Sequence, residues 1–77
     1  MFKKLELKIE IEKTRNNIEV LEFKRTESQK ALVDALLKKE EPSKDDMAVF
    51  DELTSEIEKE NLKLKELTEK LERLENG

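Results

Sequence analysis

Carboxylate side chains are the one group in this sequence whose number and spacing suggest chemistry. Of the 77 residues, 20 are Asp or Glu, and some are adjacent, as in Asp45-Asp46 and Asp51-Glu52. Paired carboxylates can act as a general acid and base when burial distinguishes them, and they can bind divalent cations. Both pairs lie in a stretch that predicts a solvated helix surface. We therefore expect neither catalysis nor more than weak cation binding.

The other residue types that support chemistry are missing. The sequence has no His, Cys or Tyr, which removes the usual general base near neutral pH and the usual nucleophiles. A single Gly leaves no phosphate-binding loop and no calcium-binding loop. The sequence thus predicts no enzyme, with no catalytic residue, no metal site and no cofactor.

Composition favours long helices. Charged residues make up 47% of the chain and hydrophobic residues 35%, with one Gly and one Pro. This profile fits helices rich in Glu, Lys and Leu, and it lacks the turn and strand residues of a sheet. The net charge of −4 and the scarcity of aromatics argue against nucleic-acid binding. No stretch is long and apolar enough for a bilayer, so we expect a soluble, cytoplasmic protein that does not bind membranes.

One break divides the chain into two helices. Residues 1–41 contain no Gly or Pro, and Pro42 disfavours helix at the residue before it. Ser43, with Asp46 three residues later, is typical of a helix N-cap. The sequence predicts a single helical hairpin over residues 1–77, with helix 1 at about 3–40, a turn at 41–44 and helix 2 at about 44–75.

The start of helix 1 has a competing interpretation. Leu5, Leu7, Ile9 and Ile11 alternate with polar residues, which is a strand pattern. No turn signal follows before Pro42, and a lone strand would have no sheet to join. We therefore predict a helix with two apolar faces.

Heptad repeats predict how the helices pair. Each helix has a seam of mostly apolar residues at alternating steps of three and four, as in a coiled coil. Helix 1 contributes Leu7, Ile11, Thr14, Ile18, Leu21, Arg25, Ser28, Leu32 and Ala35, and helix 2 contributes Phe50, Leu53, Ile57, Glu60, Leu64, Leu67, Leu71 and Leu74. Folding the chain at Pro42 places Ser28 opposite Ile57 and Arg25 opposite Glu60. The Arg25–Glu60 pair is then expected to set the register.

Apolar residues outside the seam predict an interface. They are Phe2, Leu5, Ile9, Val20, Phe23, Val33, Leu37, Val49 and Leu62, and all but Val33 and Val49 are our candidate interface residues. Apolar stripes on exposed helices generally mark association, although scattered apolar surface residues are also normal. We expect an all-α, antiparallel two-helix coiled coil. It would form a homo-oligomer, such as a four-helix bundle, or pack against another protein's helices.

The residues after the break also form a recognisable pattern. A Ser cap followed by acids, a Phe-Asp-x-Leu core, Glu-Ile and terminal leucine heptads occupy Ser43–Leu53, Glu56-Ile57 and Leu71–Glu75. This pattern resembles the N-terminal helical scaffolding segment, or delta domain, of HK97-type tailed-phage major capsid proteins. The resemblance implies a segment that guides capsid subunits into a prohead and is then removed by a phage protease. It also implies a reading frame that continues past Gly77 into a capsid fold.

Three functional hypotheses follow. The first is a non-catalytic assembly module, with capsid scaffolding, inside an assembling phage prohead, as its specific form. The second is a free-standing small helical regulator or adaptor that binds one protein partner through the extra apolar residues. The third, a nucleic-acid-binding hairpin, is disfavoured because Glu6, Glu10 and Glu12 interleave with the basic residues of helix 1.

Overall fold

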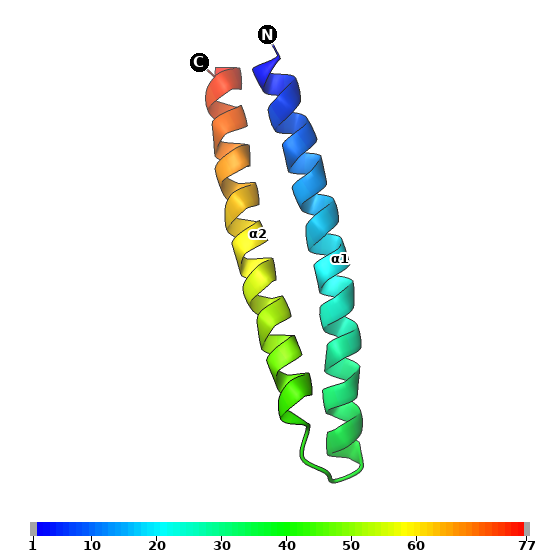
Figure 1. The fold of residues 1–77 in the computed structure, drawn as a ribbon. Coiled ribbons are helices and arrows are strands. Elements are labelled where there is room, and N and C mark those ends of the chain that lie inside the picture. Colours follow the sequence, from blue (N-terminus) through cyan, green and yellow to red (C-terminus); the bar gives the residue numbers. More distant parts are fainter. Residues whose placement is uncertain (1, 77) are drawn as a thin grey trace.

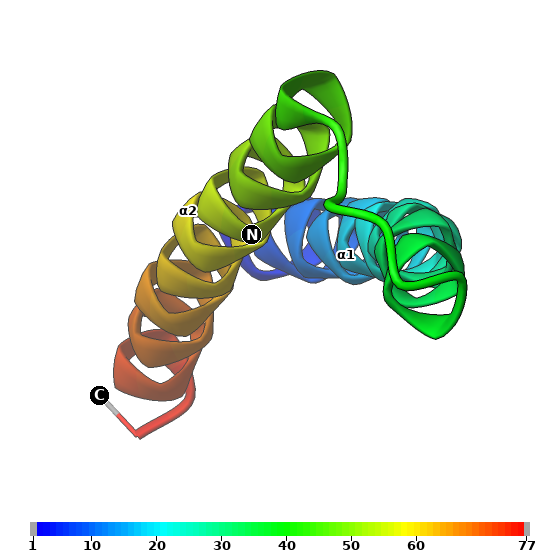
Figure 2. The same ribbon diagram turned by 90° about the horizontal axis from the view of Figure 1, so that it is seen from below.

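The computed structural model describes residues 2–76, which form two long helices. Helix α1 spans Lys3–Leu37 and helix α2 spans Lys44–Asn76. They lie side by side and antiparallel, joined by one short connection, so the start of α1 and the end of α2 lie at the same end of the hairpin (Figure 1). Viewed nearly along its length, the hairpin has helices that are inclined to one another (Figure 2). The molecule is a rod of 58 × 16 × 14 Å. The predicted all-α hairpin is confirmed.

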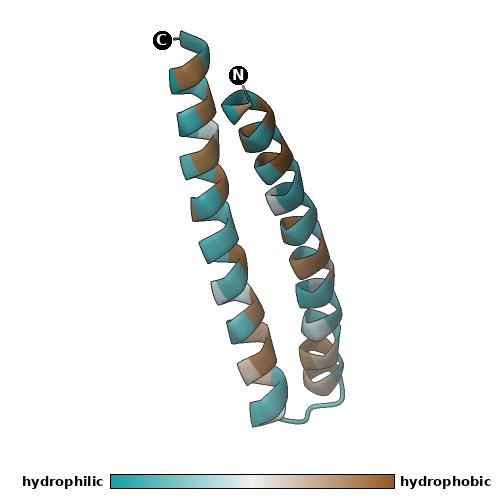
Figure 3. Ribbon diagram, turned by 45° about the horizontal axis from the view of Figure 1, so that its top comes forward, coloured by the Kyte–Doolittle hydropathy of each residue, from teal (hydrophilic) through white to brown (hydrophobic). Residues whose placement is uncertain are grey.

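The segment whose alternating pattern also suggested a strand is helical in the structure. Leu5 to Ile11 belong to the first turns of α1, because a helix satisfies its own backbone hydrogen bonds whereas a lone strand cannot. Apolar segments alternate with hydrophilic ones along both helices (Figure 3). No helix within residues 2–76 is both long and apolar enough to cross a bilayer.

The predicted seams face each other and form the core. Every predicted seam position of α1 is buried or half-buried, and so is every one of α2 except Leu74. The buried residues are Ile11, Ile18, Ile57 and Thr14. The Thr14 hydroxyl donates a hydrogen bond of 2.7 Å to the Glu10 carbonyl, so this polar group is satisfied within its own helix.

Helix α1 ends three residues before the predicted boundary. The Glu40 amide donates to the Ala35 carbonyl at 2.9 Å and the Lys39 amide donates to Leu36 at 3.0 Å. These two bonds define a Schellman motif, whose C′ residue must adopt a left-handed conformation. That residue is Lys39, with φ of 60°. Glycine normally marks such an end, and its absence explains why the sequence predicted a longer helix.

Replacing Lys39 with glycine is expected to stabilise the hairpin by about 0.5–1 kcal/mol, because glycine adopts positive φ without the Cβ clash. Urea unfolding at a fixed chain concentration would measure the change. The exposed neighbour Lys38, which has negative φ, is the matched control, and Lys38→Gly should give no gain. A Lys39→Gly variant that is less stable than the parent would contradict this description of the helix end.

Helix α2 begins where the sequence predicted. The Ser43 hydroxyl accepts a hydrogen bond of 3.0 Å from the Asp46 amide. The Ser43 carbonyl also accepts the Met47 amide at 3.1 Å. Asp45 and Asp46 place negative charge in the first turn, where the helix dipole favours it. The predicted N-cap is confirmed.

Candidate interaction surface

Arg25 and Glu60 do not form the predicted ion pair. The one ion pair within residues 2–76 joins Lys30 to Glu27 at 3.1 Å, on the exposed surface of α1. Arg25 and Glu60 are each half-buried seam residues. However, Oε2 of Glu60 is shielded from solvent and has no hydrogen-bond donor. The prediction of a direct register-setting pair is therefore wrong.

The register of the two helices explains why this pair does not form. Ser28 borders a hollow together with Asp46, Val49 and Leu53 of α2. The hollow is also lined by Phe23, Lys24 and Glu27, so residues 23–28 of α1 lie beside residues 46–53 of α2. The predicted partner of Ser28 was Ile57, about one heptad further along α2. The helices are thus displaced by about seven residues from the predicted register.

A displacement of one heptad changes the surroundings of both charged seam residues. It places Leu53 opposite Arg25, and it places the buried side chain of Ile18 opposite Glu60. Because every seventh residue of a heptad repeat has the same role, such a shift still brings one apolar seam against the other. In this register no basic seam residue lies opposite Glu60, in agreement with its unpaired carboxylate oxygen.

All seven predicted interface residues are exposed. Phe2, Phe23 and Leu37 are 70%, 67% and 77% exposed. The other four, also well exposed, are Leu5, Ile9, Val20 and Leu62. Phe2 precedes α1, but its carbonyl accepts the Glu6 amide at 2.9 Å, which ties it to the first turn. These side chains are therefore accessible to a partner.

Six of the twelve large exposed apolar residues within residues 2–76 lie along one line on α1 and the residue that precedes it. The line follows the same alternating steps of three and four as the seam and runs along the outward side of the helix, although Phe23 also borders the hollow that contains Val49 and Leu53 of α2. For example, Ile9 precedes the buried Ile11 by two residues, or about 200° around the axis. We call this line the outer stripe; it consists of Phe2, Leu5, Ile9, Glu12, Asn16, Glu19, Phe23, Thr26, Lys30, Val33 and Leu37.

The two helices differ in how they distribute apolar side chains. Helix α1 has apolar residues both on the seam and on the outer stripe, whereas those of α2 concentrate on the seam. On the outward side of α2, Leu62 stands alone among charged neighbours such as Glu58 and Lys65, which border the same shallow hollow. The candidate interaction surface is therefore the outer stripe of α1, and Leu62 is not part of it.

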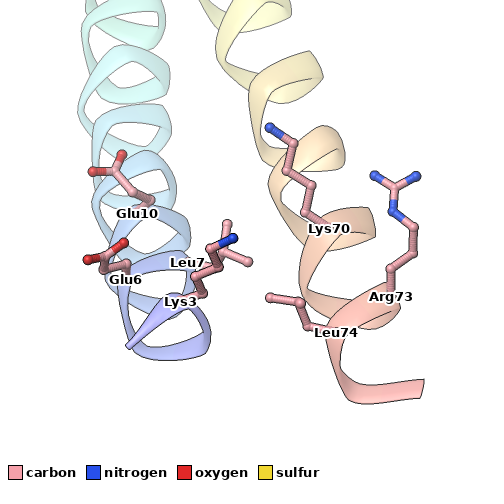
Figure 4. Close-up of a pocket in the computed structure, with 7 residues that line it drawn as sticks. All are labelled: Lys3, Glu6, Leu7, Glu10, Lys70, Arg73 and Leu74. Carbon is pink, nitrogen blue, oxygen red and sulfur yellow. The ribbon is translucent and has the colours of Figure 1, made fainter. Parts of the chain in front are cut away.

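The open end of the hairpin contains a second hollow. Leu7 of α1 and Leu74 of α2 point into the space between the helices (Figure 4). The charged residues around them are Lys3, Glu6, Glu10, Lys70 and Arg73. With both signs of charge on its rim and an apolar floor, this hollow offers no selective site for an ion.

Within residues 2–76 no three His, Cys, Asp or Glu side chains come close enough to hold a metal ion. Comparison of the chain with protein-family models, with curated proteins and with solved structures finds no match.

Proposed function

We propose that this hairpin is a non-catalytic association module that uses the outer stripe of α1 to join protein subunits. The observation that carries the proposal is the two-sided apolar character of α1. One side of α1 packs on α2, and the other side exposes Phe2, Ile9 and Phe23 at heptad spacing. A stripe of this kind gains free energy by packing against a further helix.

The small core supports the same proposal. Within residues 2–76 only four residues are buried, namely Ile11, Thr14, Ile18 and Ile57. Domains of this size usually need a stabilising element beyond one such core, and oligomerisation supplies it without disulfides or metals. The chain has no Cys, so disulfides cannot supply this element.

The specific form that we propose is a scaffolding segment that guides the assembly of capsid subunits. The resemblance of Ser43–Leu53 to the delta domain of HK97-type capsid proteins motivates this choice, and the capped hairpin is compatible with it. A regulator that binds a single protein partner would use the same stripe. The two roles differ in self-association, which assembly requires and a one-partner regulator does not.

Substituting Phe23 by glutamate is expected to weaken self-association by about 100-fold or more, because a charge replaces a large apolar contact. Light scattering over a range of chain concentrations would measure the molar mass. Leu62→Glu is the matched control, since it makes the same type of change on the outward side of α2. Leu62→Glu should leave the molar mass of the assembly unchanged at every chain concentration.

Two outcomes would contradict the proposal. A parent chain that stays monomeric at high concentration would remove the assembly role and favour the one-partner regulator. Equal loss of association in Phe23→Glu and Leu62→Glu would show that the outer stripe is not the contact surface. Circular dichroism would establish that both variants remain helical.

A further inference from the structure

The outer stripe has a length that restricts its partner. Its residues run from Phe2 to Leu37, which at 1.5 Å per residue corresponds to about 52 Å. A small globular domain could cover only part of such a line. The hairpin itself is a rod 58 Å long, so a second copy is long enough to cover the stripe from Leu5 to Leu37.

The charges of the two helices favour a second copy in one orientation. Helix α1 has eight Lys or Arg and seven Asp or Glu, a net charge of +1, whereas α2 has six and eleven, a net charge of −5. Contact between two α1 helices brings nearly neutral surfaces together. It also keeps the two acidic α2 helices on the outside, where their mutual repulsion is smallest.

The direction of pairing follows from the charged members of the stripe. In a parallel pair, each residue meets its own copy, so Glu12, Glu19 and Lys30 would each face a like charge. An antiparallel pair instead brings Glu12 opposite the partner's Lys30. The same alignment matches Asn16 with the partner's Thr26, so polar residues also meet polar residues.

The apolar ends of the stripe agree with this alignment. It places Leu5 opposite the partner's Leu37, and Ile9 opposite the partner's Val33. All four side chains are exposed in the single hairpin. Near the two-fold axis, Val20 comes beside its own copy and Phe23 packs beside the partner's Glu19. Among the layers formed by two α1 helices, this central one is where an apolar residue meets a charge; Phe2 lies beyond the partner's Leu37 and outside the paired stretch.

We infer that two copies of this chain pair through their α1 helices, antiparallel and in this register, to form a four-helix assembly with α2 outermost. The inference depends on the proposed association function and adds the identity of the partner and the geometry of the contact. The contact is isologous, because each residue pair occurs twice about the two-fold axis.

Disulfide trapping tests the geometry directly, since the chain has no Cys of its own. The variants are Ile9→Cys and Val33→Cys, both at exposed positions whose substitution leaves the hairpin core intact. Under mild oxidation, a mixture of the two variants should form a covalent dimer of twice the chain mass. Neither variant alone should do so, because a disulfide requires the two Cα atoms to be about 4.4–6.8 Å apart.

The other outcomes separate this inference from the proposed function. Self-linking of Ile9→Cys alone would establish a parallel pair and overturn the geometry, while association would stand. If the molar mass rises with chain concentration but the mixture of the two Cys variants forms no cross-link, the contact lies elsewhere. This result would also overturn the inference. A monomeric mass at all concentrations, without cross-links, would overturn both.

Discussion

Replacing Glu60 with leucine is expected to raise the free energy of unfolding by about 1–3 kcal/mol. Oε2 of Glu60 is removed from water in the seam and has no hydrogen-bond donor. A buried polar atom without a partner loses its interactions with water and gains nothing in exchange. Leucine has a similar size and completes the apolar seam between Ile57 and Leu64.

Urea unfolding of parent and variant at equal chain concentration would measure this gain. Glu58→Leu is the matched control, because Glu58 lies on the same helix but is exposed. Its effect should stay within about 0.5 kcal/mol. Glu60→Gln should give little of the gain, since an amide leaves the burial of polar atoms unchanged. A destabilised Glu60→Leu variant would mean that the carboxylate has a partner in solution.

The same substitution distinguishes the two registers when it is combined with Arg25→Leu. In the register of the structure, Arg25 and Glu60 lie in different layers. The effects of Arg25→Leu and Glu60→Leu on the free energy of unfolding should therefore add to within about 0.5 kcal/mol. In the register predicted from the sequence, the two charges would be paired, and removal of Arg25 alone would cost about 3–5 kcal/mol. A double-mutant cycle with strong coupling would therefore favour the predicted register.

The pattern of apolar residues was sufficient to predict which side of each helix is buried. In α1 every seam position from Leu7 to Ala35 is at least half-buried, even though Thr14, Arg25 and Ser28 are polar. The helix periodicity alone determines which positions face a neighbouring helix. The start of α2 was equally predictable, because the Ser43 cap is a local interaction within one turn.

The register could not be predicted in the same way. A heptad repeat looks the same after a shift of seven residues, so the apolar layers match almost equally well in both alignments. The prediction chose the alignment that paired Arg25 with Glu60. In the structure α1 ends at Leu37, earlier than predicted, in a motif whose left-handed residue is Lys39. Without glycine at that position, the sequence contains no clear signal for this end.

The candidate surface was predicted in part. The sequence identified the exposed apolar residues of α1, including Phe2, Phe23 and Leu37, because they do not fit the seam. It did not separate them from Leu62, which has the same exposure and chemistry but lies on the other helix. The position of each residue relative to the seam makes that distinction.

Replacing Ile57 with alanine is expected to lower the free energy of unfolding by about 2–4 kcal/mol. Ile57 is the most buried apolar side chain of the hairpin, with 4% of its surface exposed. The core contains few other buried residues that could move to fill the space, so the lost contacts are not replaced. For a domain of this size the loss is a large part of the total stability.

Thermal and urea unfolding would measure this loss by circular dichroism, again at one chain concentration, since association adds to the apparent stability. Ile57→Val should cost only about 0.5–1.5 kcal/mol, because it removes a single methylene group. Leu62→Ala is the matched control on the same helix and should cost less than about 0.5 kcal/mol. If Ile57→Ala and Leu62→Ala cost the same, Ile57 does not lie between the helices. The packing of α1 against α2, on which the outward position of the stripe depends, would then be wrong.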